Sequence, residues 1–420
     1  MTVFLLFMYS TTSTYQPQPD TGFRPKISVV IPAKNEAGVI QQVVKAVFDG
    51  DYPSSRLEVI AVDDGSTDET WDQLQALKRQ PRLSSRLVVI RHERNYGKRV
   101  ALASAADRAT GEIIVCIDSD SFVEPDAIKN LVQPFRDDNV TAVCGHGKAS
   151  NMNLSLLARL QHYWYAEMFR LWKGMESRYG CVTCCSGILS AYRRSTVQPL
   201  LDIWLLERFP NRQPQRDTEE GSFSLKGALT RKLIKSPGED RVLTAYALSG
   251  KGSRTVYQSN AVVKTIVPET PKRFFRQQLR WMRSWVHCGI LQGRFMWKKP
   301  APVAMIFYLY QFLSYLCPAV VVIWLVVKPL QGEWLDAVGF LAGTLYVAAL
   351  HGLNTWRYLK TPREAIPYRM MFVFIFIILT MTVTVYAWAT PWKGGWLSRE
   401  EPQSQPATIP FPTQTPDLSA

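Results

Sequence analysis

The distribution of charge along the chain constrains its fold more than any other feature. Three stretches beyond Pro302, residues 303–327, 337–356 and 370–392, contain no Asp, Glu, Lys or Arg. Each can cross the hydrocarbon core of a bilayer, which takes about 20 apolar residues as a helix. Charged residues are scattered through the rest of the chain. The pattern predicts a membrane protein whose large aqueous domain precedes a membrane-embedded third.

Composition narrows the class of protein further. A chain of 420 residues that is 47% hydrophobic and 12% aromatic is not a disordered or low-complexity protein. No Lys or Arg precedes the short apolar run at residues 3–8, so we predict no secretory signal and a cytosolic aqueous domain. The seven cysteines are odd in number and unevenly spaced, which favours reduced thiols over a disulfide framework.

Two kinds of apolar pattern alternate in the first 150 residues. Short runs rich in Val and Ile predict strands at residues 27–31, 57–62, 87–90 and 112–117. Apolar residues at helical spacing predict helices at residues 37–48, 68–78 and 99–109. This alternation indicates an α/β fold, with a mainly parallel sheet covered by helices on both faces. Ligands bind such sheets at the carboxyl ends of the strands.

Acidic residues lie at the ends of two of these predicted strands. Asp63 and Asp64 end the second strand, and Asp118 and Asp120 follow the fourth. Carboxylates gathered at one edge repel one another unless a cation lies between them, and their hard oxygen atoms suit Mg²⁺ or Mn²⁺. Each group alone could simply cap a turn. Their shared position favours a divalent metal that holds a diphosphate.

A glycine and two cations begin the helix after the third strand. Gly97, Lys98 and Arg99 could hold phosphate oxygens there, although a solvated helix start explains the same residues. The sequence contains neither the glycine-rich dinucleotide motif nor the P-loop motif. In this order, residues 27–36, the two acidic groups and residues 97–99 resemble the nucleotide-sugar-binding half of family 2 inverting glycosyltransferases.

Residues 151–270 make the resemblance narrower. An amphipathic helix over residues 154–171 could lie on a membrane or on the sheet. Residues 184–194 resemble the segment that lines the acceptor site of hyaluronan synthases and chitin-oligosaccharide synthases, with Ile188 where those families usually have proline. Glu239 and Asp240 match the acidic motif of these families. Without that match, an acidic pair that balances nearby cations would be the ordinary interpretation.

A basic and aromatic segment, residues 271–300, precedes the first uncharged stretch. Its position favours an interfacial helix on anionic headgroups over a nucleic-acid-binding helix. Gln277, Arg280 and Trp281 match the Gln-x-x-Arg-Trp motif of processive family 2 synthases. Residues at i, i+3 and i+4 share one helix face, so these three side chains can reach one pocket.

Flanking charges predict how the uncharged stretches cross the membrane. The loop 328–336 has a net charge of −1, whereas residues 357–369 carry four cations and one Glu. The positive-inside rule therefore makes the first two stretches a hairpin that returns to the cytosol. Trp396 and Arg399 belong to a segment that resembles the Trp-Gly-Thr-Arg gating motif of hyaluronan synthases, which must reach a cytosolic site. We therefore expect the third stretch to be re-entrant or interfacial.

The chain is expected to divide into six segments. They are a poorly defined N-terminal segment (1–25), the nucleotide-sugar half (26–150) and the acceptor half (151–270) of the catalytic domain, the interfacial helix (271–300), a membrane hairpin with the re-entrant segment and gating motif (301–399), and a disordered tail (400–420). Relatives usually have one or two membrane helices before the catalytic domain. Two crossings from one chain are expected to be too few to enclose a polymer channel. Three explanations stay open: copies of the chain associate, the start of the chain is incomplete, or the product is short.

The resemblance implies a GT-A-like fold and a membrane-bound, metal-dependent, inverting glycosyltransferase. It would polymerise sugars from UDP-sugar donors into a β-linked polysaccharide. The implied catalytic residues are Asp240 as general base, Glu239, Gln277, Arg280 facing the leaving diphosphate, and Trp281 against the acceptor sugar. The implied donor-binding residues are Asp63, Asp64, Lys98, Arg99, Asp118, Trp396 and Arg399, and the Mg²⁺ or Mn²⁺ ligands are Asp118 and Asp120.

The expected partners are the UDP-sugar, the growing glycan and membrane lipids, with no nucleic acid and with association between copies as one arrangement. The expected location is the plasma membrane, with several passes and a cytosolic catalytic domain. Three alternatives stay open: transfer of one sugar to a lipid carrier, a chitin-like or cellulose-like homopolymer synthase, and a catalytically silent subunit that only binds nucleotide-sugar or glycan. Product length and UDP release distinguish them.

Overall fold

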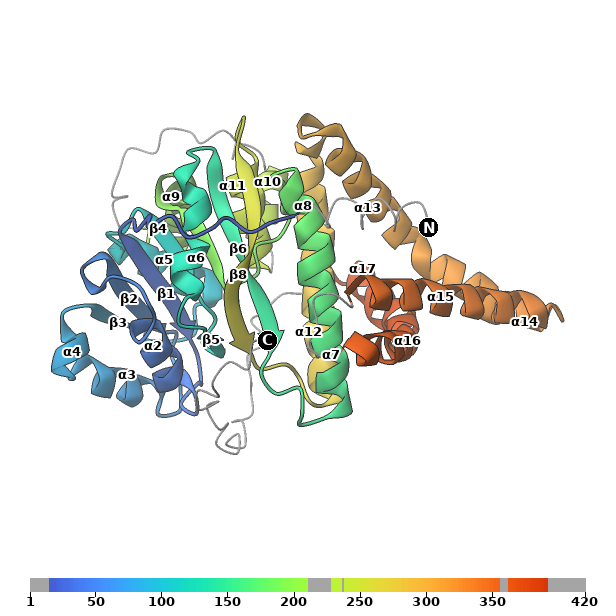
Figure 1. Cartoon of the computed structure of the whole chain (residues 1–420), viewed down its shortest axis with the longest axis horizontal. Coiled ribbons are helices and arrows are strands. Elements are labelled where there is room, and N and C mark those ends of the chain that lie inside the picture. Colours follow the sequence, from blue (N-terminus) through green and yellow to red (C-terminus); the bar gives the residue numbers. More distant parts are fainter. Residues whose placement is uncertain (1–14, 211–227, 236–237, 356–361, 392–420) are drawn as a thin grey trace.

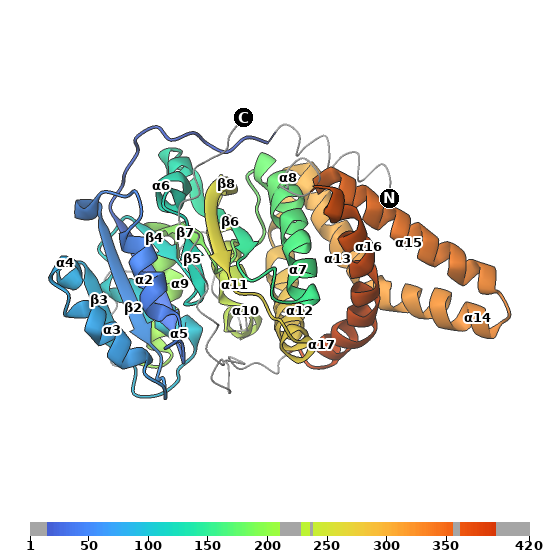
Figure 2. The same ribbon diagram turned by 60° about the horizontal axis from the view of Figure 1, so that its bottom comes forward.

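A computed structural model describes residues 15–210, 228–235, 238–355 and 362–391. Residues 1–14 of the predicted N-terminal segment 1–25, the predicted tail 400–420, and the residues Trp396 and Arg399 lie outside the described residues. In both views a mixed sheet forms one side of the molecule, two long helices stand beside it, and the apolar C-terminal helices lie beyond them (Figures 1 and 2). This order of layers places the sheet's ligand-binding edge next to the helices that precede the membrane-type segments.

One sheet of eight strands runs in the order β3-β2-β1-β4-β7-β6-β8-β5. Its strands are β1 (Ile27–Ala33), β2 (Leu57–Asp63), β3 (Leu87–Arg91), β4 (Ile113–Cys116), β5 (Ser121–Val123), β6 (Val140–Ala149), β7 (Ser190–Arg193) and β8 (Arg254–Thr265). The first four are mutually parallel, and β7 pairs antiparallel with β4 and β6. The predicted α/β class and the four predicted strands are confirmed. The two expected halves of the catalytic domain share this single sheet.

Helices cover both faces of the sheet, as the continuous apolar strands predicted. One face packs against α2 (Ile40–Phe48), α3 (Thr70–Lys78) and α6 (Ala127–Leu131). The other packs against α5 (Lys98–Arg108), α9 (Arg194–Leu206) and α11 (Glu239–Leu248). The short helices α4 (Pro81–Ser84), α8 (Gly174–Arg178) and α10 (Ala228–Ile234) complete this part. Every residue of β1 is buried, because both of its faces are covered.

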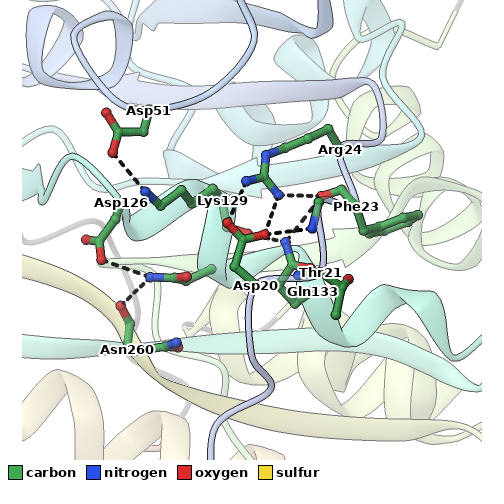
Figure 3. A network of polar contacts seen from close by, with 11 residues as sticks. Asp20, Thr21, Phe23, Arg24, Asp51, Asp126, Lys129, Gln133 and Asn260 are labelled. Carbon is green, nitrogen blue, oxygen red and sulfur yellow. Dashed lines mark hydrogen bonds and ion pairs between the residues drawn. The ribbon is translucent and has the colours of Figure 1, made fainter.

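Residues 15–24 form an extended strap across the sheet, which differs from the poorly defined segment expected there. The Tyr15 hydroxyl donates to the Tyr257 carbonyl at 2.6 Å, and Gln18 exchanges two hydrogen bonds with Gln258 of β8. Further along, the Thr21 amide and hydroxyl donate to Gln133, and the Arg24 guanidinium donates to Asp20 (Figure 3). The hydrogen bonds to Tyr257, Gln258 and Gln133, which lie more than 100 residues away in sequence, hold the strap in place.

Two long helices lie between the sheet and the apolar C-terminal segments (Figure 2). They are α7 (Leu156–Glu167), which continues as the π-helical turn η3 (Met168–Lys173), and α12 (Pro271–Gly293). Ser155 caps α7 by accepting from the Ala158 amide, and Pro271 occupies the first turn of α12. Both amphipathic helices that the sequence predicted are therefore present.

Three apolar helices of the described chain are long enough to cross a membrane: residues 301–330, 334–353 and 365–389. The first comprises α13 (Ala301–Val322), η5 (Ile323–Val327) and α14 (Lys328–Leu330), and it forms a hairpin with α15 (Trp334–Thr355). The third comprises α16 (Pro362–Leu379), η7 (Thr380–Thr384) and α17 (Val385–Ala389). It runs along α7 and α12, where the Tyr368 ring stacks on Tyr163 and the Phe372 ring on Trp164.

Candidate active site

A cavity of about 1490 Å³ opens at the carboxyl ends of the central strands and continues between α7, α12, α13 and α16–α17. At the strand ends it is lined by Pro32 of β1, by Lys34 and Glu36 after β1, and by residues 118–120 after β4. Pockets for one small ligand usually enclose about 300–1,000 Å³. This cavity therefore has room for a donor and an acceptor together.

The amino group of Lys98 is the centre of charge at the strand ends. Its Nζ atom lies 2.6 Å from Asp118 Oδ1 and 2.9 Å from Glu239 Oε1. Burial alone would lower the pKa of Lys98, but these two carboxylates outweigh burial and raise it well above its ordinary value. Burial alone would raise the pKa of Glu239, and Lys98 instead lowers it to about 2. Lys98 and Glu239 are therefore both ionised at neutral pH.

Asp118 and Asp120 both line the cavity, as the sequence predicted. Ser119 between them donates to Glu36 Oε1 at 3.1 Å, which joins the ends of β1 and β4. A Cβ atom on Gly187 would lie 2.9 Å from Lys98 Nζ and 3.1 Å from Asp118 Oδ1. Lys98, Asp118 and Glu239 form an ionic cluster, and glycine at position 187 lets its loop approach this cluster closely.

The described residues include no group of three or more His, Cys, Asp or Glu side chains placed to hold a metal ion. Mg²⁺ is commonly held by one or two carboxylates together with substrate phosphates rather than by an all-protein cage. The carboxylates of Asp118 and Asp120 are the oxygen ligands that such an ion prefers. These two residues therefore fit a metal that is bound together with a diphosphate.

Asp63 and Asp64 are fully buried and do not line the cavity, which differs from the direct donor contact expected of them. Asp64 accepts hydrogen bonds from the Tyr96 and Gly97 amides at 2.9 and 2.8 Å, and its Oδ1 lies 2.7 Å from His92 Nδ1. Because these groups occupy its oxygen atoms, Asp64 holds the cavity-lining loop at Gly97. The last strand residue, Asp63, accepts from the Ser66 amide and likewise supports a loop.

Arg99 lines the cavity beside Lys98, and its guanidinium donates to the Ile234 carbonyl at 3.5 Å. Burial lowers the pKa of Arg99. The ordinary pKa of arginine is so high that the guanidinium stays charged. Arg99 therefore adds a positive charge to the part of the cavity beside Lys98.

Asp240 lines the cavity at the start of α11. Its Oδ1 atom accepts from the Arg241 amide at 2.8 Å, and the Cys184 thiol lies 3.7 Å from Oδ2. Gly238, which precedes the helix, has a φ of +96°, and a Cβ there would lie 1.8 Å from Ser284 Oγ of α12. This close approach places Glu239 and Asp240 directly against α12.

Gln277, Arg280 and Trp281 of α12 all line the same cavity, as their shared helix face predicted. The charge of Arg280 contributes to the low pKa of Glu239. The Trp281 ring lies 5.9 Å from the Trp164 ring of α7. Within this motif, Arg280 thus lies near the ionic cluster and Trp281 lies near Trp164.

Aromatic side chains continue along the cavity away from the strand ends. Together, Trp164, Trp172, Trp281, Trp285 and Tyr310 form what we call the aromatic wall. The Arg241 guanidinium lies over the Trp285 ring at 5.3 Å, and Trp285 makes an edge contact with Tyr310 of α13 at 5.3 Å. Trp172 of η3 lies 4.9 Å from the same Tyr310 ring. Flat aromatic faces of this kind can pack against the apolar faces of sugar rings.

Most of the predicted site residues thus come together in one cavity. Those that line it are Lys98, Arg99, Asp118, Asp120, Glu239, Asp240, Gln277, Arg280 and Trp281. The other lining residues, among them Glu36, Gly187 and Trp164, were not assigned to the site from sequence. Glu36 and Gly187 belong to the segments 27–36 and 184–194, whose resemblance to known families was noted from the sequence. That resemblance is the signal that could have identified these two residues. Trp164 looked like one of several apolar residues on an amphipathic helix.

Comparison with known proteins gives matches in both sequence and structure. Residues 28–201 match the glycosyl transferase family 2 model. A hyaluronan synthase of Streptococcus pyogenes serotype M3 is 32% identical over 300 residues, which cover 71% of this chain and 66% of that protein. An N-acetylglucosaminyltransferase of Rhizobium meliloti is 36% identical over 265 residues, which cover 62% of this chain and 55% of that protein. The chain thus spans 66% of the length of the first of these relatives and 55% of the length of the second.

Among solved structures, a mannosyltransferase from Pyrobaculum calidifontis in complex with GDP-Man and Mn²⁺ has a similar fold. The TM-score is 0.56 at 21% sequence identity, and the match covers 91% of this chain and 94% of that chain. The predicted GT-A-like fold and the resemblance to family 2 are confirmed by these matches.

Proposed function

Because residues 28–201 form a glycosyl transferase family 2 domain, we propose that the chain is a membrane-bound inverting glycosyltransferase. It takes sugars from a UDP-sugar donor and joins them into a β-linked polysaccharide, as a hyaluronan-synthase-like enzyme would. One observation carries this proposal. The ionic cluster at the strand ends, the acidic start of α11 and the Gln-x-x-Arg-Trp motif, which lie far apart in sequence, line one cavity.

The donor diphosphate is proposed to lie beside Lys98, Asp118 and Asp120. A Mg²⁺ or Mn²⁺ ion held by Asp118 and Asp120 would neutralise charge on the phosphate oxygens. When the sugar leaves the diphosphate, negative charge develops on the leaving oxygen, and Lys98 and Arg280 supply positive charge there. Asp64 accepts hydrogen bonds from the Tyr96 and Gly97 amides and so fixes the loop that lines this side of the cavity.

Asp240 is proposed as the general base, and the two acidic residues differ in a way that supports this choice. Glu239 is bound by Lys98 at 2.9 Å and has a pKa of about 2, so it is a weak proton acceptor. Asp240 lines the cavity beside the aromatic wall instead. An acceptor hydroxyl that loses its proton to Asp240 attacks the anomeric carbon opposite the diphosphate. One such displacement inverts the anomeric configuration, so an α-linked donor gives a β-linked product.

Trp281 is proposed to support the acceptor sugar that carries this hydroxyl. Its ring lies 5.9 Å from Trp164, so the two tryptophans bound the cavity from neighbouring helices. A sugar ring held against these faces leaves its hydroxyls free to point towards Asp240. Repeated transfer then moves the lengthening glycan along the aromatic wall towards Trp285.

For the membrane arrangement, we propose that α13–α14 and α15 cross the bilayer as a hairpin. The α16–α17 segment lies at the interface against α7 and α12. Within their most apolar windows, 11% of the residues of each hairpin helix are buried in the protein, against 39% for α16–α17. Lys and Arg flanking the hairpin on the catalytic side favour a cytosolic catalytic domain at the plasma membrane.

The test is UDP release from membranes that contain the full chain, with Mg²⁺ or Mn²⁺ and with UDP-GlcNAc, UDP-GlcA and UDP-Glc singly and in pairs. Asp240→Asn should lower turnover at least 100-fold, since general-base catalysis contributes about 10²–10⁴-fold. Asp138→Asn, at a side chain that is 99% exposed, is the matched control and should retain turnover. An Asp240→Asn enzyme with unchanged turnover would refute the assignment of the base.

The pattern of donors and the product length then define the product. Synergy between UDP-GlcNAc and UDP-GlcA, with long products, would support a hyaluronan-type polymer. Sustained release from one donor would indicate a homopolymer or a short oligomer. No UDP release from any donor with either metal would refute the proposed activity and favour a silent binding subunit.

A further inference from the structure

The mouth of the cavity is strongly basic. Among the described residues, six cationic side chains line the cavity and are also exposed to solvent, and we call them the basic rim: Arg208, Lys232, Lys235, Lys272, Arg273 and Arg276. Glu269 is the only exposed carboxylate among the described lining residues. Glu207 lies 3.4 Å from Lys235 and offsets part of its charge. The mouth therefore carries a clear excess of positive charge.

Three cations of α12 lead inward from the mouth. Lys272, Arg276 and Arg280 stand four residues apart, so they share one face of the helix. At 1.5 Å per residue this face covers about 12 Å along the helix axis. Its inner end, Arg280, lies near the ionic cluster. The face therefore connects the basic rim with the buried site.

This placement of cations does not serve the stability of α12. Like charges four residues apart on a helix repel each other. The helix dipole favours carboxylates in the first turn and disfavours cations there. The first turn of α12 nevertheless contains Lys272 and Arg273 and no acidic residue. An anionic ligand explains these cations better than helix formation does.

The other half of the basic rim comes from the end of α9 and from α10. Arg208 follows α9, Lys232 lies on α10, and Lys235 follows α10. Helix α10 packs against α12 (Figure 2). Between the two lysines, the Ile234 carbonyl accepts a hydrogen bond from Arg99 at 3.5 Å, and Arg99 lines the inner site. The basic rim thus approaches the inner site from two sides.

The inner site does not by itself attract an anion over a long distance. At the strand ends and the adjoining helix starts, the lining carboxylates are Glu36, Asp118, Asp120, Glu239 and Asp240, and the lining cations are Lys34, Lys98, Arg99 and Arg280. These charges nearly cancel before a metal ion binds. A cleft whose charges share one sign attracts ligands of the opposite sign and raises their association rate by about 10–10³-fold. In this cavity the basic rim supplies that sign.

We propose that the basic rim captures the anionic UDP-sugar from solution and guides it along the cationic face of α12 to Lys98. This inference rests on the proposed function, because it concerns the donor of the same reaction. The rim residues take no part in bond exchange and act only on the rate at which the diphosphate reaches its site. Salt shortens the reach of a charge from about 30 Å at 0.01 M ionic strength to about 3 Å at 1 M. Capture by the basic rim must therefore weaken as the ionic strength rises.

Stopped-flow binding of the fluorescent nucleotide mant-UDP measures the association rate constant without turnover. The full chain is studied in nanodiscs of phosphatidylcholine, whose headgroups carry no net charge, at a constant concentration of Mg²⁺. The rim variant carries Lys232→Gln, Lys272→Gln and Arg276→Gln. The control variant carries Lys45→Gln, Arg79→Gln and Lys251→Gln, at exposed residues that do not line the cavity. Both variants lose the same net charge.

At an ionic strength of about 0.01 M, the association rate constant of the rim variant should be about tenfold lower than that of the unmodified protein. The control variant should stay within about twofold of the unmodified protein, and all three proteins should bind at the same rate at about 1 M. Equal rates for the rim and control variants at the low ionic strength would overturn the proposal. A difference that persists at the high ionic strength would also overturn it, because it would indicate short-range contact rather than long-range capture.

This binding test separates the capture role from the proposed function. UDP release that depends on Asp240, together with equal association rates in the rim and control variants, would leave the proposed function intact and remove only the capture role. Absence of mant-UDP binding to the unmodified protein would overturn the capture role as well.

Discussion

The ion pair between Glu239 and Lys98 allows a prediction whose magnitude follows from the structure. The Glu239 carboxylate is 19% exposed, lies 2.9 Å from Lys98 Nζ, and has a pKa of about 2 against an ordinary value of 4.5. That difference corresponds to about 3 kcal/mol of stabilisation of the folded state at neutral pH. The substitution Glu239→Gln keeps the shape and a hydrogen-bond acceptor but removes the charge. We expect a loss of about 2–3 kcal/mol, which is typical of a charged hydrogen bond.

The sign of the pH dependence follows from the direction of the shift. Because folding lowers the pKa of Glu239, its contribution is complete above the unfolded value of 4.5 and is lost as the pH falls towards 2. The stability difference between the unmodified protein and Glu239→Gln should therefore shrink to about half between pH 7 and pH 3. Thermal unfolding in detergent, followed by tryptophan fluorescence across this range, measures it. At pH 7 the Tm should fall by about 4–8 °C.

The control is Glu124→Gln, which removes the carboxylate of an ion pair with Lys264. Both side chains of this pair are about one third exposed. An exposed pair contributes about 0–1 kcal/mol, so this variant should unfold close to the unmodified protein. The reasoning is refuted if Glu239→Gln is no less stable than Glu124→Gln. It is also refuted if the difference caused by Glu239→Gln is the same at pH 3 and pH 7.

Three further predictions concern the supports of the site. Gly238→Ala should lower kcat at least 100-fold, because a Cβ would lie 1.8 Å from Ser284 Oγ and displace Asp240, the proposed base, by a fraction of an ångström or more. Asp64→Asn replaces one of the two oxygens that accept from the Tyr96 and Gly97 amides by an NH₂ group, which cannot accept. The KM of the UDP-sugar, measured by steady-state kinetics, should therefore rise about tenfold, which corresponds to about 1.4 kcal/mol. Glu167→Gln removes the charge that faces Arg369 inside the protein, and it should lower the unfolding free energy by about 3–5 kcal/mol in thermal or denaturant unfolding.

Each of these predictions has a result that contradicts it. Normal turnover of Gly238→Ala would mean that the start of α11 need not touch α12. An unchanged donor KM for Asp64→Asn would show that the loop at Gly97 keeps its shape without that carboxylate. Unfolding of Glu167→Gln at the temperature of the unmodified protein would show that the buried pair contributes no net stability.

The first four strands were predictable because both faces of a parallel sheet are covered, and continuous Val and Ile runs record this burial directly. The cavity-lining role of Asp118 followed from its place after β4. The face shared by Gln277, Arg280 and Trp281 followed from helical spacing alone. Each of these inferences depends only on neighbours along the chain. Residues 15–24 were expected to be poorly defined, because their partners, such as Tyr257 and Gln133, lie more than 100 residues away.

Local patterning, then, determined the α/β class, the amphipathic helices, the apolar C-terminal third and the motifs of a family 2 glycosyltransferase. Only the tertiary structure decided which carboxylates reach the cavity. Asp63 and Asp64 carry the same chemistry as Asp118 and Asp120, yet backbone amides and His92 engage the first pair. It also decided that Lys98 bonds Glu239 rather than Asp240, and that α13 and α16–α17 wall one cavity. The physical reason is that hydrogen-bond competition and helix packing depend on distances between remote segments, which composition and spacing do not record.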